Sequence, residues 1–183
     1  MSLTRSTIDD KPPNPKEEAL NDLLHWIWSW RIQLMRLIDS TNQQGQGDTP
    51  MDKRRSFSRA SCDEHLVLVV GRNVVRAISR AEEVFPGTDF ELAEDKALSL
   101  LRNLYEHWDE QKGSFQNASI PKIRSGKEFI NSFPSGKPWS ITYVENDWLI
   151  GGVVLLNMVS QQLDGIEGKA LELEEIMKNK NRA

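Results

Sequence analysis

Residues 16–41 read KEEALNDLLHWIWSWRIQLMRLIDST, and this stretch decides the fold class. Its apolar residues recur at intervals of three and four, the spacing of one face of an α-helix. They are Leu20, Leu23, Leu24, Ile27, Leu34 and Ile38. Trp26, Trp30 and Leu37 add a second apolar edge, so the helix is apolar over more than one face. Either it covers the core with one side and a partner subunit with the other, or it is buried within its own domain.

Working outward, a polar stretch at 42–59 that contains Gly45, Gly47 and Pro50 is expected to form a loop or linker. Ser61 then suits the N-cap of a second helix, which is expected to end before Pro86. Thr88 or Asp89 is expected to cap a third helix over 90–112. Residues 113–139 are rich in Gly, Pro and Ser, and only a short helix at 127–132 is expected there.

The C-terminal third of the chain changes pattern. Residues 140–144 alternate as a β-strand does, Asn146 and Asp147 favour a turn, and residues 148–152 return as the second strand of a hairpin. A last helix is expected at 155–178. The sequence therefore predicts a mainly α protein, an antiparallel bundle of about four long helices with a short β-hairpin near its C-terminus. We expect one domain at 16–178, between a disordered segment at 1–15 and a tail at 179–183.

Composition excludes several classes of protein. The net charge of −4 argues against nucleic-acid binding over the whole surface, although a local basic patch remains compatible with it. Cys62 is the only cysteine, so the chain has no internal disulfide. No run approaches the ~18 apolar residues of a membrane helix, and the N-terminus lacks the apolar core of a signal peptide. We therefore expect a cytoplasmic protein that does not bind membranes.

One segment of the expected third helix carries chemistry: Arg102-Asn103-Leu104-Tyr105-Glu106-His107. His107 lies beside the apolar stripe, Asn103 one turn before it, and Arg102 farther round. The set suits RNA cleavage, because a histidine removes the ribose 2′-OH proton and a guanidinium stabilises the charge of the phosphorane. An amide orients the histidine or the phosphate, and no metal is required. The plainer interpretation is an Arg102–Glu106 ion pair with His107 at the core boundary.

This segment resembles the motif of the HEPN superfamily, small helical bundles marked by an Arg, a short spacer and a His, often with Asn or Asp after the Arg. Arg102-Asn103-x-x-x-His107 fits that pattern. The Asp63-x-His65 segment and the glycine pair at 151–152 before the last helix also resemble HEPN-like proteins. The resemblance covers about residues 16–178.

The resemblance implies a metal-independent endoribonuclease without a cofactor that leaves a 2′,3′-cyclic phosphate. His107 is then the base or acid, Arg102 stabilises the phosphorane, and Asn103 assists. HEPN RNases commonly act as homodimers in which both motifs share one cleft. Many bacterial members are toxins or antiphage effectors, which implies a possible antitoxin or regulatory protein. Those paired with nucleotidyltransferase antitoxins often carry His-x-Tyr, whereas this chain has His107-Trp108-Asp109.

Three further polar residues are candidates for binding the RNA. Asn73 falls among apolar positions of the second helix, where an amide needs a partner. It either makes an ordinary core hydrogen bond or faces the active site. Lys122 and Arg124 form a basic patch, for which a solvated loop is the plainer interpretation. A second basic patch, at residues 53–59, is expected to be a solvated loop.

Two other functions stay open. Some HEPN domains are inactive and only bind, so a non-catalytic regulatory or protein-interaction domain is the main alternative. A metal-dependent hydrolase is the other, because His25, His65 and His107 with Asp63 or Glu64 supply metal-ligand types on different helices. No helix, however, has the His-x-x-x-His or Glu-x-x-His spacing usual in bundle metal sites.

Overall fold

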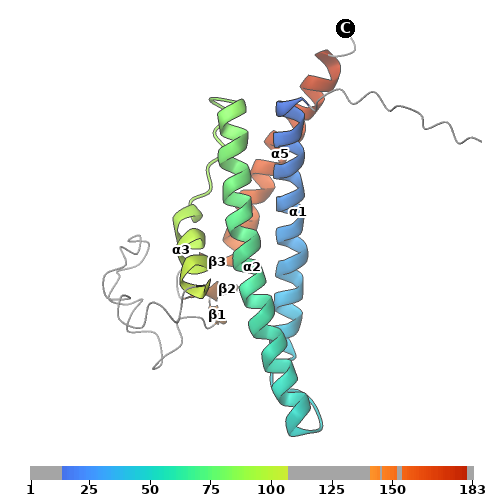
Figure 1. Ribbon diagram of the computed structural model, residues 1–183, viewed down its shortest axis with the longest axis vertical. Helices are drawn as coiled ribbons and strands as arrows, with labels where there is room; N and C mark the ends of the chain where they lie inside the picture. Colours follow the sequence, from blue (N-terminus) through green and yellow to red (C-terminus); the bar gives the residue numbers. More distant parts are fainter. Residues whose placement is uncertain (1–13, 107–140, 145, 152–153, 181–183) are drawn as a thin grey trace, which may run out of the picture.

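The computed structural model describes residues 14–106, 141–144, 146–151 and 154–180. The helices of these ranges are α1 (Pro15–Asn42), α2 (Pro50–Val84), α3 (Asp95–Glu106) and α5 (Leu156–Lys180) (Figure 1). The strands are β1 (Ile141–Val144), β2 (Asp147–Ile150) and β3 (Val154–Leu155), which form one antiparallel sheet in that order. The predicted mainly helical fold with a β-hairpin near the C-terminus is confirmed, and the two-residue third strand is an addition. The expected N-terminal segment up to residue 13 and the expected helix at 127–132 lie outside the described residues.

The starts of α1 and α2 follow from their first residues. The Asn14 side chain accepts a hydrogen bond from the Lys16 N–H at 3.1 Å and caps α1. Thr49 and Asp52 form a reciprocal capping box at the start of α2, where Pro50 occupies the first turn. A loop is present at 43–49, but its predicted extension to residue 59 and the predicted cap at Ser61 are wrong. Pro50 was interpreted as a loop signal, but proline after a capping threonine is a helix start.

The start of α3 also differs from the prediction. Phe90 and Leu92 are buried in non-helical backbone that precedes the helix, and α3 begins only at Asp95. Asp89 has a left-handed φ of 57°, which suits a turn and not the N-cap of a helix that continues through Phe90. The two apolar side chains fill the core from a non-helical segment. In the sequence, they therefore resemble the first buried residues of a helix.

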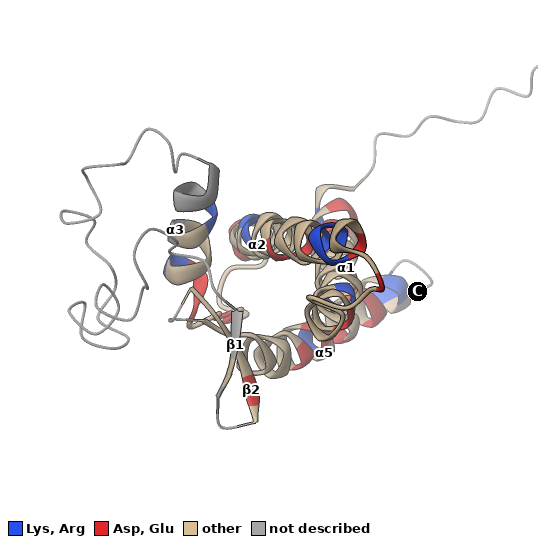
Figure 2. Ribbon diagram, turned by 90° about the horizontal axis from the view of Figure 1, so that it is seen from below, with Lys and Arg blue, Asp and Glu red and all other residues tan. Residues whose placement is uncertain are grey.

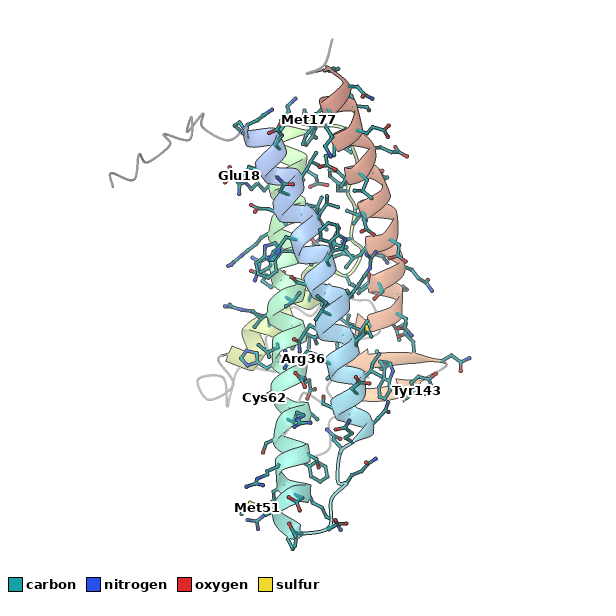
Figure 3. All side chains as sticks on the ribbon, turned by 90° about the vertical axis from the view of Figure 1, so that its right-hand side faces the viewer. Glu18, Arg36, Met51, Cys62, Tyr143 and Met177 are labelled. Atoms are coloured by element: carbon teal, nitrogen blue, oxygen red, sulfur yellow. The ribbon has the colours of Figure 1, made fainter. Side chains whose placement is uncertain are left out.

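The helices enclose one apolar core. Its largest fully buried side chains come from all four described helices, from the segment before α3 and from β2: Trp30, Phe90, Leu20, Leu23, Ile27, Leu37, Leu68, Leu98, Ile150, Leu156 and Leu163. α2 packs antiparallel to α1, and α5 packs on α1 through contacts that include Arg31–Asp164 at 2.6 Å (Figure 3). α3 packs on α2 (Figure 2). None of the helices in the described part of the chain is long and apolar enough to cross a membrane.

The hairpin connects α3 to α5. Asp147 pairs with Val144 in the strand ladder instead of lying in the turn, and its carboxylate accepts the N–H groups of Asn157 at 2.8 Å and Met158 at 3.2 Å. These two N–H groups belong to the first turn of α5, so Asp147 caps that helix. Gly151 has a φ of 59°, and a Cβ built on it would lie 2.4 Å from Leu101 Cδ2 of α3. Glycine thus permits the close approach of the sheet to α3.

Candidate functional site

The motif predicted to carry chemistry lies at the C-terminal end of α3. Arg102 and Asn103 are both helical, and the described part of α3 ends at Glu106. Arg102 is half-buried and takes part in interactions with its surroundings. His107, Lys122 and Arg124 lie outside the described residues. The structure therefore places one of the predicted catalytic side chains, and it places the backbone of a second.

Arg102 lies on the side of α3 that faces α2. Two contacts define that side: Arg72 Nη1 donates to Ser99 Oγ at 2.9 Å, and Leu98 lies against Gly71 of α2. Arg102 follows Leu98 by one helical turn and Ser99 by slightly less than one, so it points in the same general direction. Arg72 and Arg102 therefore line one seam between the two helices. Sequence reasoning missed Arg72, whose signal is its place beside the apolar stripe of α2.

The same two contacts set which residues of α2 lie level with the end of α3. The chain reverses between α2 and α3, so each step forward along α3 corresponds to a step back along α2 (Figure 1). Counting equally from the Arg72–Ser99 contact, Glu106 comes level with His65, roughly 10 Å along both helices. Glu64 is 6% exposed and His65 is half-buried. The acid Glu64 and the imidazole of His65, both of α2, thus lie level with the described end of α3.

On the side of α2 that faces α1, the buried polar group at this height is the carboxylate of Asp63. The Asp63 carboxylate is 3% exposed and accepts from Gln33 Nε2 at 3.1 Å. Arg36 Nη2 lies 3.1 Å from the same oxygen and neutralises the charge from the solvent side. Gln33 is itself 6% exposed. Because its hydrogen bonds and its charge are satisfied across the α1–α2 interface, Asp63 serves this interface.

Asn73, a predicted RNA contact, lies elsewhere on α2. It follows Arg72 by one residue and is therefore turned by about 100° around the helix. Arg80, about two turns later and on nearly the same side as Asn73, pairs with Glu18 at 2.8 Å and Asp22 at 2.5 Å in α1. The half-buried Asn73 thus lies toward α1, and the structure does not bring it beside Arg102.

The N-terminal end of α3 has the opposite electrostatic character. A cavity of about 380 Å³ opens there between α2 and the segment before α3, and four of its lining residues are acidic: Glu82, Asp89, Glu91 and Asp95. Glu94 points away from this cavity, is 2% exposed and hydrogen-bonds to Gln162 of α5. Burial raises the pKa of the Glu94 carboxyl. With four acidic residues and one lysine in the lining of its cavity, this end of α3 is less favourable for a phosphate than the Arg102 end.

Metal-ligand types do not gather in the described part of the chain. His25 is exposed on α1 and stacks edge-on against Trp26, with ring centroids 5.1 Å apart. Among the residues of the described ranges, no three His, Cys, Asp or Glu side chains form a group that suits a metal ion. The third histidine of the metal hypothesis, His107, lies outside these ranges.

Comparison with known proteins found no relative of this chain: no model of a protein family, no curated protein and no solved structure matches it.

Proposed function

We propose that this protein is a metal-independent endoribonuclease of the HEPN type. The observation that carries the proposal is the seam between α2 and α3. There, the half-buried Arg72 and Arg102 belong to two packed helices joined by the Arg72–Ser99 hydrogen bond, and the Arg102-Asn103-x-x-x-His107 motif begins on the second. Guanidinium groups at a partly desolvated seam are suited to a phosphodiester and to the additional negative charge of its phosphorane.

The reaction assigns one role to each residue of the motif. His107 removes the proton of a ribose 2′-OH, whose oxygen forms a bond to the adjacent phosphorus. The bond from phosphorus to the 5′ oxygen breaks, and that oxygen leaves with a proton, so the products are a 2′,3′-cyclic phosphate and a 5′-OH. Arg102 stabilises the charge on the phosphorane, and Asn103 orients the phosphate or the imidazole. Lys122 and Arg124 bind the RNA backbone, and a homodimer places two motifs in one cleft. A toxin or antiphage role, with a neutralising partner, fits such an activity.

The first test is cleavage of total cellular RNA in EDTA by the purified wild-type chain and by Arg102→Ala and His107→Ala. Arg55→Ala is the matched control, because Arg55 is an exposed arginine in the first turns of α2. We expect cleavage by wild type and by the Arg55 variant, and loss of at least ~100-fold of the rate in the other two. The 3′ ends of the products should resist ligation until the cyclic phosphate is hydrolysed and the remaining monophosphate is removed, and the 5′ ends until they are phosphorylated. Equal cleavage by all four proteins would assign the activity to another site or to a contaminant.

A specific observation also favours the second candidate, a non-catalytic interaction domain. α1 exposes three large apolar side chains at helical spacing: Trp28 is 49% exposed, Ile32 64% and Met35 67%. An apolar stripe on an outer helix face is typical of protein–protein contacts. In this case, Ile32→Asp should change the oligomeric state in solution or abolish partner binding, whereas Arg102→Ala should leave both unchanged.

A further inference from the structure

A basic and hydroxyl-bearing stripe runs along one side of α2. Its six members, which we call the α2 stripe, are Arg54, Ser58, Ser61, His65, Arg72 and Arg76. At about 100° per residue, their spacing keeps all six within an arc of about 60°. From first to last, the stripe extends roughly 33 Å along the helix. Arg54, Ser58, Ser61 and Arg76 are exposed, and the other two are half-buried.

Acidic residues of α2 avoid this side over the length of the stripe. Asp63 lies on the opposite side of the helix, where it is buried against α1, and Glu64 is 6% exposed. Several arginines elsewhere on the protein have carboxylate partners, as Arg31 has in Asp164 and Arg80 has in Asp22. Within the described ranges, the arginines of the stripe form no such ion pair, and Arg72 donates to the neutral hydroxyl of Ser99. The stripe therefore offers three arginines that no carboxylate of the described part of the chain neutralises.

The stripe meets the candidate site at one point and an acidic surface at its end. Arg72 contacts Ser99, which lies within one turn of Arg102 on α3. Beyond Arg76, the acidic cavity lined by Glu82 and Asp95 begins. A polyanion on the stripe is thus led past Arg102 and is repelled at the cavity.

We propose that the α2 stripe binds the sugar–phosphate backbone of single-stranded RNA and directs it to Arg102. The choice of RNA rests on the proposed function, whereas the anionic character of the ligand rests on the charges of the stripe. Because the net charge of the chain is −4, binding is confined to this local track instead of spreading over the surface. A single strand fits because one helix edge contacts one backbone, and because attack by the 2′-OH needs a linkage flexible enough to align.

The test measures binding separately from cleavage. The probe is a fluorescent 2′-O-methyl oligoribonucleotide, which lacks the attacking hydroxyl, and its anisotropy is followed over roughly 50–200 mM salt. Arg54→Ala/Arg76→Ala removes two exposed cations from the stripe. Arg55→Ala/Arg59→Ala is the control, because it removes two exposed arginines from the same helix but from another side, with the same change in net charge. Circular dichroism establishes that both variants remain folded.

We expect the stripe variant to bind roughly tenfold more weakly at the lowest salt and to reduce the slope of log affinity against log salt by about 1.4. The control should bind as wild type does. If both variants lost affinity for the oligonucleotide equally, the loss would be an effect of net charge alone, and the proposal would be overturned. Absence of binding by the wild type, or binding to phosphatidylserine vesicles in place of the oligonucleotide, would also overturn it.

These results separate the stripe from the proposed catalysis. If wild type binds the oligonucleotide through the stripe but cleaves no RNA in EDTA, the proposed role of the α2 stripe is supported and the proposed RNase activity is rejected. If cleavage depends on His107 but the stripe variant binds RNA as tightly as wild type does, the proposed RNase activity is supported and the proposed role of the α2 stripe is rejected.

Discussion

Trp30 of α1 and Ser160 of α5 are joined by a hydrogen bond from the indole Nε1 to the hydroxyl Oγ at 3.0 Å, across 130 positions of sequence. The indole ring is fully buried. Ser160 Oγ in turn donates to the Leu156 carbonyl oxygen at 3.1 Å, so the serine has both a donor and an acceptor role at the α1–α5 interface. This buried contact therefore acts together with the Arg31–Asp164 ion pair to fix the register of the last helix against the first.

Removing that contact should destabilise the protein without removing much apolar surface. We expect Ser160→Ala to lower the free energy of unfolding by about 1–3 kcal/mol, because the buried indole N–H is left without an acceptor. Urea unfolding measures the change. In Trp30→Phe, which lacks the donor, Ser160→Ala should cost markedly less. If both backgrounds lose the same free energy, the hydrogen bond is not the cause.

Gly71 marks the closest approach of three helices. A Cβ built on Gly71 would lie 3.0 Å from Leu98 Cδ2 of α3 and 3.0 Å from Trp30 Cζ3 of α1. Gly71→Ala should therefore destabilise the protein by about 1–3 kcal/mol through overpacking. The matched control is Gly168→Ala in α5, where nothing lies within 4 Å of the added Cβ. That change should stabilise the protein by about 0.5–1 kcal/mol, and thermal melts of the two variants should shift in opposite directions.

Glu94 should make stability depend on pH. Since burial raises its pKa above 4.5 in the folded state, the folded protein holds this proton more tightly than the unfolded chain does. The stability that the protonated Glu94 contributes is fully present below the pKa of this group in the unfolded chain. It is lost as the pH rises through the pKa of Glu94 in the folded protein. At pH 7, Glu94→Gln should therefore unfold at a higher temperature than wild type, and the difference should vanish near pH 4. Glu91→Gln, at an exposed neighbour, should show no such convergence.

Thr49 should control the first turn of α2, which carries Arg54 and the adjoining cations. Its hydroxyl accepts the Asp52 N–H at 3.2 Å and lies 2.6 Å from the Asp52 carboxylate. Thr49→Ala should cost about 1 kcal/mol of local stability, seen as faster hydrogen exchange of the amides at 52–55. Ser58→Ala, at an exposed position within the same helix, is the control. Unchanged exchange at 52–55 would show that the tertiary contacts of α2 hold this turn without the cap.

Much of the fold was predictable from local pattern, since spacing of Leu, Ile and Trp marks α1 and alternation marks the hairpin. Errors arose where one residue type has two meanings. Pro50 both breaks and starts helices, and Phe90 fills the core without being helical. Leu66 of α2 is apolar and yet 41% exposed, because periodicity gives a repeat but not which neighbour covers each face.

The candidate site was predictable only along one helix. The spacing of Arg102 and Asn103 follows from the sequence, because both residues lie on α3. The approach of Arg72 and Ser99 depends on how α2 and α3 pack, and no local pattern encodes it. For the same reason, periodicity did not reveal that Asn73 lies on the α1 side of α2.

The contact between Trp30 and Ser160 also sets a sequence of events during synthesis. α1 leaves the ribosome long before α5, and at about 5–20 residues per second the delay between Asn42 and Lys180 is roughly 7–28 s. During that interval, the α1–α2 hairpin can form, but the face of α1 that α5 later covers is open to water. The nascent chain therefore exposes the face of α1 that carries Trp28 and Trp30 until α5 has been made and packs on it.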